Sequence, residues 1–267
     1  MGNSRTTVAS DLQTVSTVIE DQAELSEASA PRDRAPVSQQ VIVFLAVVLP
    51  FVAFIAAIIL MWGRGGVYWP ELTVFGLMYF ITGFGVTIGY HRLFTHRSFE
   101  TIRPVKWIFA IAGSMAVEGP LLKWVAMHRR HHQHSDEHHD PHSPHGWGAG
   151  LKGVIAGFWH AHVGWLFLAD PPELEKYVKD LHEDRALRTI SHLFPLWVVL
   201  GLLIPTVLGG IMTQSWLGAL LGFIWGGLVR VFMVHHITWS INSVCHLWGS
   251  KTYKSKDESR NNAIFGV

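Results

Sequence analysis

The sequence predicts an all-α integral membrane protein, in which four transmembrane helices carry a histidine-rich helical cap on the cytosolic side. Three observations lead to this fold class. Only 15% of the 267 residues are charged and 49% are hydrophobic, whereas an ordinary soluble domain has about a quarter of its residues charged. Four apolar stretches are long enough to cross a bilayer core about 30 Å thick. The 17 histidines gather near the ends of these stretches.

The four predicted spans form two hairpins, because short loops join the first span to the second and the third to the fourth. Residues 41–62 have no polar side chain, and the second span is uncharged from Leu72 onwards. The third span contains two prolines, which membrane helices tolerate as kinks. The fourth continues past Arg230. The expected boundaries are about residues 41–62, 70–90, 192–212 and 216–239.

The remainder divides into a tail and a cap. Residues 1–40 are polar and without periodicity, so we expect a disordered tail before a single domain at residues 41–267. Residues 107–122 and 153–169 are apolar but too short or too polar to cross. We expect both to lie at the membrane surface as interfacial or re-entrant helices.

Basic residues predict the orientation. The segments between the second and third spans and after the fourth carry most of the Lys and Arg, whereas the opposite loops carry only Arg64. The positive-inside rule therefore places both termini and the central segment in the cytoplasm. A net charge of +1 without a basic block argues against a nucleic-acid partner, and the single Cys245 excludes an internal disulfide.

The histidines fall in three groups near the predicted cytosolic ends of the spans. His91 and His96 follow the second span, and Asn242 and His246 follow the fourth. Between them, His128, His131 and His132 have the i, i+3, i+4 spacing that puts three side chains on one helix face. Neutral imidazole is the commonest metal ligand, and six of them exceed what one tetrahedral zinc can use. The pattern favours two metals, and redox-active iron could activate O₂, although spacing alone does not identify the metal.

Plainer interpretations stand beside this one. The run 128–145 could be a solvated, metal-scavenging loop. Within that run, His134, His138, His139, His142 and His145 fit loop or supporting roles better than direct ligation. His235 and His236 fit hydrogen-bonded positions, while His160, His162, His182 and His192 fit interfacial or surface ones. Arg92, Arg97, Arg129 and Arg130 fit contacts with lipid headgroups. Glu118 could be a buried hydrogen-bonded acid or an interfacial one, and Trp124 could line a channel or pack in the core.

The chain resembles the membrane-bound fatty acid desaturases, in particular the stearoyl-type (Δ9-like) acyl-CoA branch, from about residue 41 onwards. His91-Arg92-Leu93-Phe94-Thr95-His96 is similar to that family's HxxxxH box, and His128-Arg129-Arg130-His131-His132 to its HxxHH box. Asp140-Pro141-His142, His162-Val163-Gly164-Trp165-Leu166 and Asn242-Ser243-Val244-Cys245-His246 are also similar to family segments.

The resemblance implies a His-ligated di-iron site that uses O₂ to introduce a cis double bond into a saturated acyl chain. The iron ligands it implies are His91, His96, His128, His131, His132 and His246, with Asn242 acting through water. It also implies a bent acyl tunnel beneath the irons, for which Trp124 is a candidate lining residue. The implied partners are membrane lipid, a fatty acyl substrate linked to CoA, lipid or a carrier protein, and an electron donor such as cytochrome b5, rubredoxin or ferredoxin with its reductase.

Two departures from the family pattern matter. A third box, HxxHH, is expected shortly after Ser259-Arg260-Asn261-Asn262, but no histidine follows His246. We therefore expect a C-terminally truncated sequence whose 267 residues alone are inactive. In addition, Ala126-Met127 and Ala169-Asp170 stand where basic residues around the CoA phosphates are expected, which favours a lipid or carrier protein over CoA.

Two other functions are compatible with this pattern. A membrane di-iron hydroxylase of alkanes or carotenoids would share the histidine groups and the topology. A His-rich metal transporter would place its ligands in the middle of the bilayer, whereas these histidines lie near one face.

Overall fold

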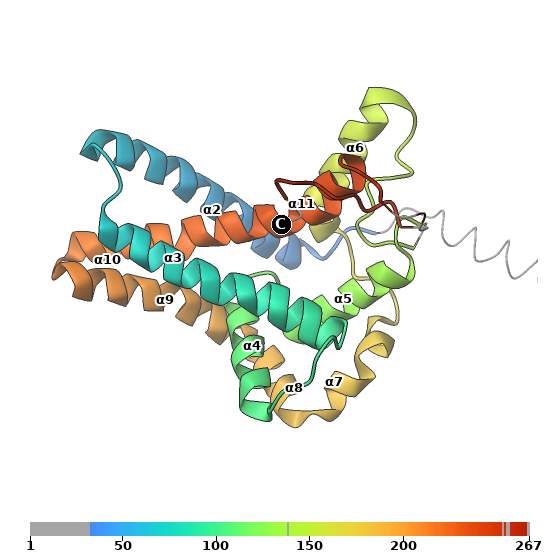
Figure 1. Cartoon of the computed structure of the whole chain (residues 1–267), viewed down its shortest axis with the longest axis horizontal. Coiled ribbons are helices and arrows are strands. Elements are labelled where there is room, and N and C mark those ends of the chain that lie inside the picture. Colours follow the sequence, from blue (N-terminus) through green and yellow to red (C-terminus); the bar gives the residue numbers. More distant parts are fainter. Residues whose placement is uncertain (1–32, 138, 253, 255–256, 266–267) are drawn as a thin grey trace, which may run out of the picture.

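The computed structural model describes residues 33–265, apart from 138, 253, 255 and 256. These residues form helices joined by loops, and their only β-type pairings are two isolated bridges. Four long helices run alongside one another, and shorter helices extend from one end of the bundle (Figure 1). The all-α expectation and the four spans are confirmed. The expected tail lies largely outside the described residues.

The first hairpin joins α2 (Val37–Arg64) to α3 (Trp69–Phe84), which continues without a break as the π-helix η1 (Gly85–Thr95). Gly65 ends α2 in the left-handed conformation, with φ of 77°. Glu71 then caps α3 by accepting a hydrogen bond from the Tyr68 backbone N–H at 3.1 Å. Both helices extend beyond the predicted boundaries, α2 by starting at Val37 and η1 by ending at Thr95.

The second hairpin joins α9 (Phe194–Thr213) to a longer composite helix. This helix consists of α10 (Trp216–Gly222), the π-helix η4 (Phe223–Val229) and α11 (Arg230–Leu247). Ser215 caps α10 by accepting a hydrogen bond from the Gly218 N–H at 3.0 Å. Since α11 continues to Leu247, the fourth helix reaches eight residues beyond the expected end at 239.

Arg230 is fully buried inside the bundle and bonded to backbone carbonyls. Pro205 has no N–H, so the carbonyl four residues earlier, that of Gly201, lacks its helical partner. Arg230 Nη2 donates to this carbonyl at 2.8 Å, and Nη1 donates to the Met115 carbonyl at 2.7 Å. A buried guanidinium is tolerated when its donors are satisfied, and here it joins α9, α11 and the end of α4 (Arg103–Met115).

Short helices lie between the two hairpins in the chain, near the histidines. They are α4, α5 (Leu121–Gln133), α6 (Gly150–His162), η2 (Gly164–Phe167), η3 (Leu174–Val178), α7 (Lys179–Glu183) and α8 (Arg185–His192). The two apolar stretches that were not expected to span form α4 and α6, of 13 residues each. At 1.5 Å per residue such a helix is about 20 Å long, too short for a bilayer core.

The two ends of the described chain pack onto η2 and onto the end of α11. Ala35 is buried, and its N–H donates to the Phe167 carbonyl at 3.0 Å. Near the other end, the Arg260 N–H donates to the Cys245 carbonyl at 2.7 Å. Residues 33–36 are therefore ordered against η2, and helix α2 begins at Val37, within the last part of the expected tail.

Candidate metal centre

His91 and His96 face the same direction because the helix that carries them is a π-helix. Its hydrogen bonds join residues five apart, and the His96 N–H donates to the His91 carbonyl at 3.0 Å. In a π-helix, residues five positions apart therefore lie one above the other. In an α-helix, residues four positions apart do so. The two Nε2 atoms are 3.0 Å apart. The spacing of the first histidine motif thus matches the local helix type.

Helix α5 adds two imidazoles from the opposite side. Its Nε2 atoms of His128 and His132, one helical turn apart, are separated by 3.1 Å. The ring centroids of His91 and His128 are 4.8 Å apart, and those of His96 and His132 are 4.5 Å apart. One ring nitrogen from each of these four residues lies within 4.8 Å of all the others. We call His91, His96, His128 and His132 the four-histidine group.

A second cluster lies on the other side of His128, where two imidazoles are each backed by a carboxylate. His131 Nδ1 is 2.9 Å from both oxygens of Asp140, and His246 Nδ1 is 2.9 Å from Asp136 Oδ2. The rings of His131 and His246 are 5.5 Å apart. Metal-binding histidines usually donate their second ring N–H to a carboxylate in this way. We call His131 and His246 the carboxylate-backed pair.

His142 lies beside this pair. Its ring centroid is 4.3 Å from that of His131, and it is 3% exposed. Its Nδ1 is buried without a hydrogen-bond partner, yet it belongs with His131 and Asp140 to a group whose ligand atoms could surround an ion. Buried polar atoms are nearly always satisfied, and an ion in the site is one way to satisfy this one.

Burial keeps the imidazoles of His128 and His132 neutral. It lowers the pKa of His128 well below its usual value, and the neighbouring imidazoles add to the effect. The pKa of His132 falls to about 4, mainly through burial and also through the charges of other histidines. Although burial alone would raise the pKa of Asp140, bonding to His131 and nearby imidazoles lowers it well below the usual range. At pH 7, His128 and His132 are therefore neutral nitrogen donors near an ionised carboxylate, as metal binding requires.

Trp124 lies next to the four-histidine group. Its ring centroid is 4.8 Å from that of His128, and its Nε1 donates to Glu118 Oε2 at 3.0 Å. Glu118 also accepts a hydrogen bond from Thr238 Oγ1 at 2.5 Å. Of the two interpretations of Glu118, the structure favours the hydrogen-bonded acid, and burial raises its pKa to about 7.

The remaining predicted residues are placed as follows. Asn242 is half-buried on α11, one helical turn before His246. His235 Nε2 is 3.1 Å from the carbonyl oxygens of Ala116 and Val117, so this histidine is hydrogen-bonded within the bundle. His162 lies between Ser243 and His236, at 2.8 and 2.9 Å. His138 lies outside the described residues.

Arg97 and Arg129 both make ion pairs with Asp180. Arg129 is largely buried there, which argues against a contact with lipid headgroups, whereas the side chain of Arg97 stays exposed. Neither this arrangement nor the roles of Asp136 and Asp140 was recognised in the sequence. The signal that could have revealed the roles of Asp136 and Asp140 is their position inside the histidine-rich run 128–145. Carboxylates there can accept hydrogen bonds from the second ring nitrogens of metal-binding histidines.

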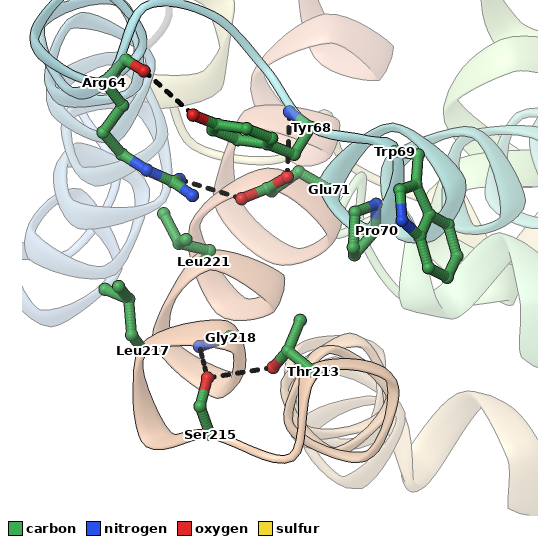
Figure 2. A pocket seen from close by; sticks show the side chains of 10 residues that line it. All are labelled: Arg64, Tyr68, Trp69, Pro70, Glu71, Thr213, Ser215, Leu217, Gly218 and Leu221. Atoms are coloured by element: carbon green, nitrogen blue, oxygen red, sulfur yellow. Dashed lines mark hydrogen bonds and ion pairs between the residues drawn. The ribbon is translucent and has the colours of Figure 1, made fainter.

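A cavity of about 280 Å³ lies at the opposite end of the bundle, where the turns of the two hairpins meet (Figure 2). Arg64 Nη1 donates to Glu71 Oε1 at 2.9 Å beside it, and Ser215 and Thr213 line its other side. Among the described residues, no histidine lines this cavity. It is therefore separate from the candidate metal centre.

Comparisons with known proteins give relatives of one kind, and no family model matches the chain. The chain is 44% identical over 221 residues to the hex-5-enoyl-[acyl-carrier protein] acetylenase of Moorena producens, covering 80% of this chain and 67% of that protein. It is 34% identical over 201 residues to Delta-9 acyl-lipid desaturase 1 of Arabidopsis thaliana, covering 72% and 58%. It is 35% identical over 197 residues to the sn-1 stearoyl-lipid 9-desaturase of Anabaena variabilis, covering 72% and 65%.

The similarity covers most of this chain but a smaller share of these relatives. The chain spans less than two thirds of the two desaturases and two thirds of the acetylenase. The four candidate membrane helices and the histidine groups of the structure agree with this similarity to desaturases. The chain belongs to the fatty acid desaturase family.

Proposed function

We propose that this chain forms the membrane core of an O₂-dependent fatty acyl desaturase with two histidine-bound irons. The observation that carries the proposal is the convergence of four ring nitrogens from η1 and α5 within 4.8 Å of one another. The carboxylate-backed pair beside them supports a second metal. In addition, family relatives are named for reactions on acyl chains.

The donor set fits iron. Imidazole suits iron as well as zinc, copper and nickel, and the carboxylates next to His131 and His246 leave the Nε2 lone pairs of these residues free for a metal. The proposed ligands of one iron are His91, His96, His128 and His132. The proposed protein ligands of the other are His131 and His246, with Asn242 acting through a water molecule.

Bound there, two irons would supply the oxidation in which O₂, two electrons and two protons remove two hydrogens from adjacent methylenes, leaving a double bond and two waters. The chain's own residues hold the reacting partners in place. Helices η1 and α5 fix the imidazoles from two sides, and burial keeps those of His128 and His132 neutral. Trp124 packs directly against His128 and, in this proposal, lines the acyl channel. Its indole is fixed by Glu118, so it can orient a methylene pair.

The substrate in this proposal is a fatty acyl chain carried by a membrane lipid or a carrier protein. Two observations support these carriers over CoA. Ala126 and Met127 are buried and offer no positive charge, and Asp170 is ion-paired with Lys123 at 2.8 Å. The electrons come from a separate protein such as ferredoxin, rubredoxin or cytochrome b5 with its reductase. In this arrangement both termini and the metal centre face the cytoplasm, where such donors are found.

A second candidate function is the formation of a triple bond. It is favoured by the 44% identity to a protein named as an acetylenase, compared with 34% and 35% to the two desaturases named above. The same metal centre would serve, because this reaction removes two hydrogens from an existing double bond. The substrate would then be an unsaturated acyl chain on a carrier protein.

The two remaining alternatives predict different products or positions. A hydroxylase of the same architecture would yield an alcohol. A metal transporter needs ligands along the translocation path, but His91 and His246 lie near one end of their membrane-spanning helices.

Product analysis tests the proposed function. The full-length parent protein that contains these 267 residues is expressed in bacteria. Its membranes are incubated with O₂, reduced ferredoxin and its reductase, and acyl-lipid or acyl-carrier-protein substrates, and the products are identified by mass spectrometry. We expect an alkene that is lost in H128A and retained in H192A, since His192 is an exposed residue of α8. An alkyne would support the acetylenase, an alcohol the hydroxylase, and metal uptake into sealed vesicles the transporter.

A further inference from the structure

One carboxylate outside the histidine groups connects the two segments that carry the four-histidine group. Asp180, in α7, accepts hydrogen bonds from Arg129 Nη1 and Nη2 at 2.7 and 3.1 Å. It also pairs with Arg97 Nη2 at 2.6 Å. Each of these arginines directly follows a histidine of the group, Arg97 after His96 and Arg129 after His128.

Arg129 also binds the end of η1 directly. Its Nη2 donates to the Phe94 carbonyl at 2.6 Å and its Nε to the Thr95 carbonyl at 3.4 Å. Carbonyls in the last turn of a helix have no partner within the helix, so the guanidinium satisfies them. A further bond from Nη1 reaches the Tyr177 carbonyl of η3 at 2.6 Å. One side chain of α5 therefore binds η1, η3 and α7 at the same time.

The two arginines keep Asp180 ionised in this contact. Burial acts to raise the pKa of Asp180, but hydrogen bonds and charges from Arg129 and Arg97 outweigh it, so the pKa lies below its usual value. Asp180 is therefore ionised at neutral pH. The planar guanidinium can donate in several directions at once, which the single ammonium of a lysine cannot reproduce. Because the N–H groups of Arg129 already donate to acceptors within the protein, few of them remain for a lipid headgroup.

We propose that Arg129, Asp180 and Arg97 form a clamp that sets the distance between the histidine pair of η1 and the histidine pair of α5. The inference rests on the proposed metal centre and adds positioning residues to it. Among the described residues, the hydrogen bonds of Arg129 join the end of η1 to α5 beside the histidines. Without the clamp, the four ring nitrogens lose their common centre, because ligand geometry tolerates only a few tenths of an ångström.

Cobalt binding to the detergent-solubilised chain tests the clamp, because Co²⁺ reports its ligands in its visible spectrum. We expect R129K and D180N to weaken cobalt binding at least tenfold and to change the spectrum of the bound ion. The matched controls are R130K and D170N. Arg130, the next residue of α5, donates to the His139 carbonyl at 3.3 Å, and Asp170 forms a half-exposed pair with Lys123. Both controls should bind cobalt as the unaltered chain does.

A second measurement does not depend on metal. In the metal-free protein, amide hydrogen exchange at residues 91–98 should be faster in D180N than in D170N, while exchange in α9 stays the same. This separates the clamp from a general loss of fold and remains informative if R129K does not fold. Cobalt affinity, spectrum and exchange unchanged in D180N would overturn the clamp. Absence of cobalt binding by the unaltered chain would instead overturn the metal centre on which it rests.

Discussion

At the scale of single residues, the candidate centre depends on which atom each imidazole turns inward. A histidine has two ring nitrogens, and a partner on Nδ1 leaves Nε2 for a metal. Asp140 and Asp136 provide that partner for His131 and His246. Two carboxylates from the loop that follows α5 therefore determine the orientation of ligands on α5 and α11.

Replacing Asp140 by asparagine tests this orientation. The amide keeps the size of the carboxylate but removes its charge and offers only one acceptor to His131. We expect D140N to weaken binding of the second metal about 10- to 100-fold, as loss of such a partner typically does. Cobalt stoichiometry measured by titration checks it. E137Q is the control because Glu137 is about half exposed, and equal stoichiometry in D140N and E137Q would contradict the assignment.

Glu118 predicts a pH dependence of stability whose sign follows from its raised pKa. Burial lifts the pKa from the ordinary 4.5 to about 7, so the folded chain binds this proton more tightly than the unfolded chain. The stabilising effect is complete below about pH 4.5 and is lost as the pH rises through 7. We expect the melting temperature of the unaltered chain to fall between pH 5 and 8 relative to that of E118Q. A constant difference across this range would refute the raised pKa.

At the scale of elements, the π-helix η1 explains the five-residue spacing of its histidines and also its contact with α4. Gly85 begins η1 where the backbone of Gly113 passes close by. A Cβ at Gly85 would lie 2.3 Å from the Gly113 nitrogen, whereas one at Gly83 would meet no atom within 4 Å. The close approach of η1 and α4 therefore depends on the missing side chain of Gly85, together with those of Gly89 and Gly113.

The G85A variant should lower the melting temperature, because backbone atoms of α4 cannot move aside as a flexible side chain can. G83A, two residues earlier in α3, should not lower it, since alanine is a better helix former than glycine and the site is open. Thermal unfolding of both variants in the same detergent checks the prediction. A melting temperature of G85A equal to that of G83A would contradict the close packing.

At the scale of the whole molecule, the two ends of the helical bundle differ. The histidine groups lie near the ends of η1 and α11, and the cavity beside Arg64 lies at the other end of the bundle. Large apolar side chains are exposed along α2, α3 and α9, as expected for helices that face lipid. The distribution of Lys and Arg predicts that the histidine face is cytoplasmic.

Labelling of single cysteines tests this orientation. In a C245A background, S98C lies just beyond η1 on the histidine side and Q214C lies in the turn between α9 and α10. Both positions are exposed. In intact cells an impermeant maleimide should label Q214C and leave S98C unlabelled until the membrane is opened. The reverse pattern would overturn the orientation.

Much of this architecture was predictable from local sequence. Length and hydropathy determine a membrane span almost independently of the surroundings, because every backbone polar group in lipid must bond within its own helix. The predicted spans therefore agree with α2, α3 with η1, α9 and α10 with α11. The histidines of α5 were placed on one face by the same local argument. The spacing of His91 and His96 required the π-helix, whose presence no local pattern revealed.

The sequence by itself determined that four apolar helices cross a membrane and that histidines gather near one end, since both properties depend on neighbours within a turn or two of the chain. Only the tertiary structure decided which carboxylate orients which imidazole and that Arg97 and Arg129 bind Asp180. It also decided that Glu118 contacts Thr238. The two residues of each pair are close in space, although they are 9, 51, 83, 110 or 120 positions apart in the chain. Contacts across such separations depend on how the helices pack, and no local pattern encodes that packing.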